Sequence, residues 1–343
     1  MSASTMEVST PTATPPVTPQ RIMQFAWGYA ATLILEAAVR NKIFDTLDAG
    51  PKTVDEVHAA TGASTRGLTA VMNALVGFEL LDKDAQGRYS LTPESATFLV
   101  STKPSYSGGM IAHTSEQLVP KWLNLSEIVR TGKAEGALNQ QDSGAAFFEK
   151  LVPNIFNMSY PSAQALAAHL RLDKAHVLDL ATGSGVWGIA LAQSSPNVRV
   201  SVVDWPSILE VTKKTVARFG VGDRFSYIPG DLGQADFGSG YSVATLGHIL
   251  HSEGEARSRK LLKKTFQALA PGGTIAIAEF LVNQDRKGPA MGLIFAVNML
   301  VNTDDGDTYS FEEISQWLRE AGFTNPRKLE SPGPSPLILA TKP

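Results

Sequence analysis

The chain of 343 residues contains no cysteine. Disulfide bonds, thiolate metal sites and a cysteine nucleophile are therefore excluded, and we expect a reducing, cytoplasmic location. An excess of charge of one sign is also lacking, because 30 Lys and Arg nearly balance 33 Asp and Glu and the formal net charge is -3. This balance creates no field that would attract a polyanion, so we expect no nucleic-acid partner.

Long apolar runs are scarce as well. The best candidate, residues 291–301, is shorter than the ~18 residues needed to cross a bilayer and contains Asn298. We therefore expect no membrane-spanning segment. Residues 1–19 are rich in Ser, Thr and Pro and lack the basic start and apolar core of a secretory signal, which is typical of a disordered tail.

The length favours two domains, and residues 20–107 have the pattern of a helical first domain. The pattern is that of a winged helix-turn-helix, and it is carried by a helical repeat at 25–40, a capping box at Thr53 and Glu56, a helix capped by Ser64 or Thr65, and strands at 79–82 and 88–91. We expect residues 108–162 to form a helical connector that lines a pocket.

A winged helix can read DNA, but this one has few phosphate-binding side chains. The presumptive recognition helix carries one basic residue, Arg66, and the wing region is acidic at Glu79, Asp82 and Asp84. The pattern therefore favours a dimerisation scaffold over a DNA-binding regulator, which remains the less favoured alternative.

Residues 163–343 begin with a strand, a glycine turn and an alanine-rich helix. The strand at 176–180 leads into Ala181, and Gly183, Gly185 and Gly188 follow with the spacing of dinucleotide-binding turns. Glycines let a ligand approach the backbone, and the free N–H groups at the helix start favour polar or anionic groups. The turn alone does not distinguish a nicotinamide cofactor from S-adenosylmethionine.

Three acidic residues near strand ends favour S-adenosylmethionine. Asp179 precedes the turn, where it would meet an amino group and repel a pyrophosphate. Asp204 follows the next strand and is placed to accept bonds from both ribose hydroxyls. Gly230, Asp231 and Leu232 form a further turn, whose carboxylate can accept a bond from an adenine amino group.

The last two strands, at 327–330 and 337–341, predict an antiparallel edge on an otherwise parallel sheet. With these features the chain, from residue 22 to its end, resembles the class I methyltransferases, specifically the two-domain small-molecule O-methyltransferases of plants and bacterial natural-product pathways. The resemblance implies a Rossmann-like α/β domain with a mostly parallel seven-stranded sheet. It also implies a homodimer in which the first domain contributes to the partner's pocket.

The resemblance implies roles for individual residues too. Asp204 would hold the ribose, Asp231 and Leu232 would flank the adenine, and His251 would be the catalytic base oriented by Glu279. The sequence departs from the family at three places: Gly247 replaces a common Lys or Arg, Ala181 replaces the first glycine of the turn, and His251-Ser252-Glu253 replaces His-Asp-Trp. Trp205 is then the candidate for the missing stacking on adenine.

A base is expected because a phenol, with a pKa of roughly 10, is mostly protonated at neutral pH. His251 starts a helix after the strand at 242–246, at the carboxyl edge of the sheet where ligands bind. C- or N-methylation, or a reaction without methyl transfer, remains open on the same fold. The histidines without chemical neighbours in the sequence are interpreted as surface or core residues: His58, His113, His169 and His176. No spacing indicates a metal site.

The acceptor is expected to be a small, largely apolar aromatic or polyketide-like molecule. Candidate wall residues lie in two helical segments, with Thr308 near the position of a second acidic residue of the plant enzymes. They are Phe148, Phe156, Met158, Met291, Phe295, Asn298, Met299, Asn302 and Thr308. For the segment 291–302, a place in the core or in a dimer interface is equally compatible with the pattern.

Overall fold

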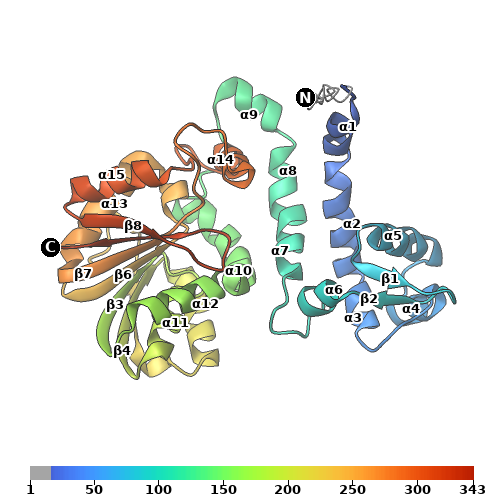
Figure 1. The fold of residues 1–343 in the computed structure, drawn as a ribbon, viewed down its shortest axis with the longest axis horizontal. Helices are drawn as coiled ribbons and strands as arrows, with labels where there is room; N and C mark the ends of the chain where they lie inside the picture. The colour runs from blue at the N-terminus through green and yellow to red at the C-terminus, as the bar shows by residue number, and fades with distance from the viewer. Residues whose placement is uncertain (1–16) are drawn as a thin grey trace, which may run out of the picture.

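The structure is a computed structural model that describes residues 17–343. Most of the expected tail at 1–19 thus lies outside the described residues. The rest forms a small, mainly helical domain and a larger α/β domain, with helices α7 and α8 standing between them (Figure 1).

The small domain has the winged-helix order expected from the sequence. Its elements are α1 (Gln20–Ala26), α2 (Gly28–Arg40), α3 (Ile43–Leu47), α4 (Val54–Thr61), α5 (Thr65–Gly77), β1 (Leu81–Lys83), β2 (Tyr89–Leu91) and α6 (Pro93–Phe98). The capping box of Thr53 and Glu56 is present at α4, and the Ser64 hydroxyl accepts the Gly67 N–H at the start of α5. Local capping chemistry therefore fixed these helix starts.

Helices α1 and α2 expose an apolar surface. By length and hydropathy the segment Gln20–Arg40 is sufficient to cross a membrane, and 6% of its apolar window is buried in the described chain. A search for uninterrupted apolar runs does not find this segment, because Arg21 and Glu36 interrupt it. Its mean hydropathy is nevertheless high. Its exposed large side chains include Ile22, Met23, Phe25, Trp27 and Tyr29. Length and composition alone are weak evidence for a span, because a subunit interface passes the same test.

The connector consists of α7 (Gly108–His113), a π-helical turn (Thr114–Leu118), α8 (Val119–Trp122), α9 (Leu125–Thr131) and α10 (Gln141–Leu170). Helix α10 runs through residue 162, where the second domain was expected to begin, and it contains Pro153 and Pro161. Its last turns bury Ala163, Leu166 and Ala167 against the α/β core. The packing of this helix therefore continues across the expected boundary.

The large domain is a seven-stranded sheet of order β5-β4-β3-β6-β7-β9-β8. The strands are β3 (Lys174–Leu180), β4 (Asn197–Asp204), β5 (Phe225–Pro229), β6 (Tyr241–Gly247), β7 (Leu269–Ala278), β8 (Thr324–Leu329) and β9 (Leu337–Thr341). Only β9 runs antiparallel to its neighbours, which confirms the mostly parallel sheet with an antiparallel edge.

Helices cover both faces of this sheet (Figure 1). They are α11 (Val186–Ser194), α12 (Pro206–Arg218), α13 (Leu250–Ala268) and α15 (Phe311–Ala321), whereas α14 (Ala290–Asn302) lies beside α8 and α9 of the connector. The central strands are buried on both sides, as all-parallel strands require. This arrangement brings the carboxyl ends of β3, β4, β5, β6 and β7 to one edge, where the predicted acidic residues and His251 lie.

Candidate active site

The glycine turn after β3 is anchored by a carboxylate beneath it. Asp179 is fully buried; Thr182 Oγ1 and the Gly188 N–H donate to its Oδ2 at 2.7 and 3.1 Å, and Thr245 Oγ1 donates to its Oδ1 at 2.7 Å. Burial raises the pKa of Asp179 to about 6. Three donors of the chain itself thus bind the Asp179 oxygens, and a direct contact with a ligand amino group stays a prediction.

The turn above Asp179 has left-handed backbone at three residues: Ala181 has φ +51°, Gly183 +54° and Gly185 +81°. Two of these are glycines, which adopt such angles without strain. Ala181, which stands where the family has glycine, is held in a conformation that a side chain disfavours.

Asp204, at the end of β4, lies next to this turn. Its Oδ2 accepts the Gly183 N–H and its Oδ1 accepts the Trp205 N–H, both at 2.8 Å. Burial raises the pKa of Asp204 to about 6. Each carboxylate oxygen can accept more than one bond, so the geometry leaves room for the two ribose hydroxyls.

Trp205 packs against the connector. Its ring meets Phe148 edge to face at 6.0 Å, and a Cβ added at Gly144 of α10 would lie 2.9 Å from the Trp205 Cη2 atom. The indole thus joins the end of β4 to α10. Its stacking on adenine remains a prediction.

The third predicted turn carries Asp231. The Gly230 N–H donates to the Asp204 carbonyl at 3.0 Å, Asp231 Oδ1 accepts the Gly233 N–H at 2.8 Å, and Leu232 is buried. The sequence analysis missed the neighbour of this turn, Arg257, whose guanidinium lies 3.5 Å from Asp231 Oδ2.

Arg257 is itself held by Glu253, at 2.7 Å. Glu253 occupies the position of the family's aromatic residue, so an ion pair stands where the family places a ring. Nothing in the sequence spacing linked this pair to Asp231, which lies 26 residues away.

The replacement at Gly247 has a steric reason. A Cβ at Gly247 would lie 2.0 Å from Nε1 of Trp187, which is buried in α11. Trp187 therefore fills the space that the Lys or Arg side chain of the family would need. Only glycine fits beside this indole.

His251 and Glu279 form a buried pair. They follow the neighbouring parallel strands β6 and β7, and the carboxylate binds the histidine twice: His251 Nδ1 lies 2.7 Å from Oε1, and the His251 N–H donates to Oε2 at 2.8 Å. Burial acts to raise the pKa of Glu279, but His251 opposes this, and the net effect is a lowered pKa. In the described part of the chain the other ring nitrogen, Nε2, has no hydrogen-bond partner.

The neighbouring His248 has a different environment. Its Nε2 lies 2.6 Å from the Ser335 hydroxyl, and burial lowers its pKa to about 4. A histidine with such a pKa is neutral at physiological pH. Its bond to Ser335 joins β6 to the loop before β9.

An aromatic wall stands against the His251 ring. Phe295 of α14 meets it edge to face at 4.9 Å, and Phe280 lies 4.3 Å from Phe295. Phe295 therefore lies beside the predicted base, and its place in an acceptor wall stays a prediction. Met291, on the same helix, and Met158, on α10, are exposed by 57% and 40%, and neither has a described contact with this ring.

Four predicted wall residues are buried within the described chain. Phe156 is buried and stacks on Tyr160 and Phe219 in the core, and Met299 is 5% exposed. The Asn302 amide is buried and bonded within the chain, to Lys121 and Asn298. Their contact with an acceptor stays a prediction, because helical spacing cannot tell which apolar face meets the core.

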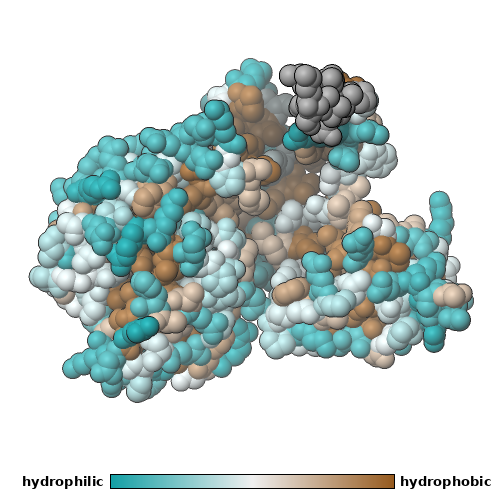
Figure 2. Space-filling view, viewed as in Figure 1, coloured by the Kyte–Doolittle hydropathy of each residue, from teal (hydrophilic) through white to brown (hydrophobic). Residues whose placement is uncertain are grey.

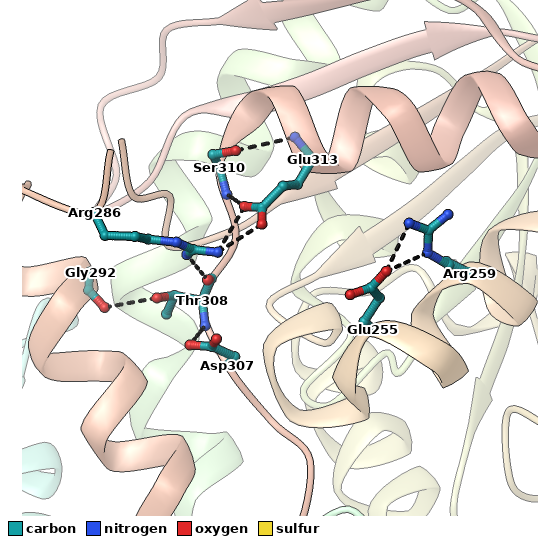
Figure 3. Close-up of polar contacts among 8 residues, drawn as sticks. All are labelled: Glu255, Arg259, Arg286, Gly292, Asp307, Thr308, Ser310 and Glu313. Atoms are coloured by element: carbon teal, nitrogen blue, oxygen red, sulfur yellow. Dashed lines mark hydrogen bonds and ion pairs between the residues drawn. The ribbon is translucent and has the colours of Figure 1, made fainter. Parts of the chain in front are cut away.

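Thr308 is the fourth of these residues. It is 1% exposed, and its hydroxyl donates to the Gly292 carbonyl at 3.1 Å (Figure 3). Arg286 donates to the Thr308 carbonyl and pairs with Glu313 at 2.8 and 3.0 Å (Figure 3). The next residue back, Asp307, donates its N–H to the His251 carbonyl at 2.9 Å. This segment therefore supports His251 through its backbone, and the contact of Thr308 with an acceptor stays a prediction.

Comparisons with known proteins agree with this architecture. The O-methyltransferase domain family matches residues 122–324, and the O-methyltransferase dimerisation domain family matches residues 23–101. A 3-hydroxy-5-methyl-1-naphthoate 3-O-methyltransferase of Streptomyces sahachiroi is 30% identical over 98% of this chain and 100% of its own length. The tetracenomycin polyketide synthesis 8-O-methyl transferase TcmO of Streptomyces glaucescens is 27% identical over 95% of this chain and 97% of its own.

A solved structure has the same fold along nearly the whole chain. Human N-acetylserotonin methyltransferase, in complex with SAM, has a TM-score of 0.84 at 22% identity, covering 96% of this chain and 99% of that one. More than half of this chain matches the catalytic family, and the dimerisation family precedes it. The chain belongs to the two-domain type of S-adenosylmethionine-dependent O-methyltransferases.

Proposed function

We propose that this enzyme methylates a hydroxyl group of a small aromatic or polyketide-like acceptor, with His251 as the general base. The observation that carries the proposal is the pair of hydrogen bonds between Glu279 and His251, one at Nδ1 and one at the backbone N–H. These bonds leave the ring nitrogen Nε2 free. A carboxylate at Nδ1 fixes the tautomer whose Nε2 accepts a proton and stabilises the cation that then forms.

The cofactor would be held at the carboxyl edge of β3 to β5. The left-handed turn of Gly183 and Gly185 lets a ligand approach the backbone, Asp204 offers oxygens to the ribose, and Asp231 with Leu232 borders the adenine. When bound, S-adenosylmethionine supplies an activated methyl group. The chain then has to align the acceptor and remove one proton, from the hydroxyl oxygen to His251 Nε2.

The test is His251→Ala, with His169→Ala, an exposed histidine at the end of α10, as the matched control. Removing the base should lower kcat on a phenolic acceptor by about 10²- to 10⁴-fold. Binding of S-adenosylhomocysteine, measured by calorimetry, should stay within error. Unchanged turnover would refute the role of His251, and mass analysis that finds the new methyl group on carbon or nitrogen would refute O-methylation.

We further propose that the enzyme acts as a cytoplasmic homodimer that contacts its second copy through α1 and α2. The dimerisation family covers α2 and residues 23–26 of α1, and the exposed apolar side chains of both helices need a cover. The double variant Ile22→Asp, Phe25→Asp should be a monomer in light scattering, whereas Gln24→Asp on the same helix should remain a dimer. A dimeric double variant would place the interface elsewhere.

A further inference from the structure

Three polar residues form a stripe on the helix between the two domains. His113, Gln117 and Lys121 are spaced four residues apart, so they share one face of the helix that runs from α7 to α8. The π-helical turn at Thr114–Leu118 lies between them. Such turns are rare and occur frequently at functional sites. The sequence analysis assigned His113 no function, and it did not single out Gln117 or Lys121.

Two buried polar atoms of the stripe have no hydrogen-bond partner among the described residues, and Lys121 has one, Asn302. His113 is 6% exposed and its Nδ1 has no hydrogen bond in the described structure, and neither has the buried Oε1 of Gln117. Lys121 is half-buried, and no carboxylate of the described residues lies within ion-pair distance of it. Burial lowers the pKa of His113 and of Lys121. Unpaired buried polar groups are costly, which makes a concentration of them on one helix face informative.

Aromatic rings connect the stripe to the cofactor edge. His113 meets the Phe147 ring edge to face at 4.9 Å, and Lys121 Nζ lies 5.2 Å from the centre of the same ring. Phe147 contacts Phe148 at 5.2 Å, and Phe148 contacts Trp205, next to Asp204. The stripe and the predicted ribose site are therefore linked by a row of rings.

A second set of contacts connects the stripe to the base. Trp122, which follows Lys121, donates its indole N–H to Asn298 Oδ1 at 3.1 Å. Asn298 lies one turn from Phe295 on α14, and Phe295 contacts His251. Figure 2 shows hydrophobic surface in the recess between the two lobes, where these helices face each other. The contacts thus form a wall from Trp205 to His251 with the polar stripe in its middle.

We propose that the stripe of His113, Gln117 and Lys121 is an acceptor subsite that binds a carboxylate of the acceptor, with Lys121 as the cation. This inference rests on the proposed function and names its substrate class, a hydroxyaryl carboxylic acid. The hydroxyl would face His251 and the carboxylate would lie at the stripe, with the aryl rings against Phe147 and Phe295. Lys121 Nζ keeps two donors beyond its bond to Asn302 Oδ1 at 3.1 Å, and the Gln117 amide can turn its NH₂ to the ligand.

The competing explanation is structural: Lys121 would only join α8 to α14 through Asn302. The two explanations differ in whether the charge of Lys121 recognises the acceptor. Lys121→Gln keeps a donor for Asn302 and removes the charge, Lys121→Arg keeps the charge, and Lys121→Met removes both. Lys133→Met, at an exposed lysine in the loop after α9, is the matched control.

The experiment compares hydroxynaphthoic acids with their methyl esters, which differ in the charge of one group. The wild type should prefer an acid over its ester, as the ratio of kcat/KM, by on the order of tenfold or more, because a charged hydrogen bond is lost in the ester. Lys121→Gln and Lys121→Met should abolish that preference, mainly through KM, while Lys121→Arg and Lys133→Met should retain it. Calorimetry on the enzyme loaded with S-adenosylhomocysteine should show the same order in the Kd of the acid.

The outcomes separate the two proposals. If Lys121→Gln lowered kcat/KM equally for acids and esters, the carboxylate subsite would be overturned and O-methylation would stand. A wild-type enzyme that methylated acids and esters equally well would lead to the same conclusion. Binding of the acid that depends on the charge of Lys121, with no methylation of any hydroxyl, would support the subsite and refute the proposed function. If Lys121→Met lowers the melting temperature of the enzyme, the kinetics of Lys121→Gln decide between the carboxylate subsite and a structural role of Lys121.

Discussion

The cofactor edge and the acceptor wall of this enzyme are built in different ways. At the cofactor edge each carboxylate accepts at least one hydrogen bond from a residue a few positions away: Asp179 from Thr182, Asp204 from Trp205 and Asp231 from Gly233. In the acceptor wall the bonds join distant segments, such as Lys121 and Asn302, 181 residues apart, and several polar atoms have no partner. The difference indicates that the chain completes the site for the common cofactor by itself, whereas the acceptor supplies the missing partners of the wall.

The largest expected effect is on kcat. It concerns Glu279, which lies where the cofactor edge and the acceptor wall meet. In Glu279→Ala the base loses both of its anchors, and kcat should fall by about 10²- to 10⁴-fold, as in His251→Ala. Glu279→Gln keeps an acceptor for the Nδ1–H but not the charge, so it should retain more activity than the alanine variant. Steady-state kinetics test this order, and equal activities of Glu279→Ala and wild type would show that Glu279 does not orient the base.

The next effect tests whether the cofactor edge is as self-contained as its contacts indicate. Asp179→Ala leaves the Thr182 and Thr245 hydroxyls and the Gly188 N–H without their acceptor, and each such loss costs about 1–3 kcal/mol. We expect the free energy of unfolding to fall by about 3 kcal/mol or more in urea titrations. Asp179→Asn, which keeps the shape and one acceptor, should cost less. A neutral Asp179→Ala would mean that the turn holds itself without the carboxylate.

Much of the cofactor edge could be predicted from sequence because its determinants are local. The strand and turn after it, the acidic residue at each strand end, and the capping box at Thr53 all lie within a few residues of one another. The direct role of Asp179 toward a ligand stays a prediction, but its bond to Thr245, 66 residues away on another strand, could not be predicted from the sequence. Sequence spacing does not show that a carboxylate will be enclosed from both sides.

The acceptor wall was less predictable from the sequence, because its contacts join residues that are far apart in the chain. Phe295 and Phe156 both belong to apolar helical patterns, but one meets His251 and the other stacks in the core on Phe219. Only the docking of α10 and α14 against the sheet decides between these places. The pairing of Trp187 with Gly247 likewise joins two elements that are far apart in the chain.

Proton linkage offers a smaller effect that is confined to the cofactor edge. Burial raises the pKa of Asp204 to about 6, so the group is mostly protonated at pH 5 and mostly ionised at pH 7. Only the ionised form offers both oxygens to ribose hydroxyls, so the affinity for S-adenosylhomocysteine should rise by up to about tenfold from pH 5 to pH 7. The stability contribution has the opposite sign, since a raised carboxyl pKa makes the folded state less favourable as pH rises from about 4 to about 6.

Calorimetric titrations at several pH values test this linkage. Asp204→Asn should bind more weakly at pH 7 and lose most of the dependence, which separates Asp204 from Asp179, whose pKa burial also raises to about 6. A wild-type affinity that does not change between pH 5 and pH 7 would contradict the proposed contact between Asp204 and the ribose.

The smallest effect concerns strain that the cofactor edge tolerates at Ala181. A non-glycine residue at φ +51° costs about 1–2 kcal/mol, whereas glycine adds about 0.4–1 kcal/mol of unfolded-state entropy. Ala181→Gly should therefore raise the free energy of unfolding by about 0.5 kcal/mol. Ala217→Gly, in right-handed helix α12, should lower it by a similar amount or slightly more. If both substitutions destabilised the enzyme equally, the left-handed turn would not store strain at Ala181, and the alanine would be no worse than the glycine of the family.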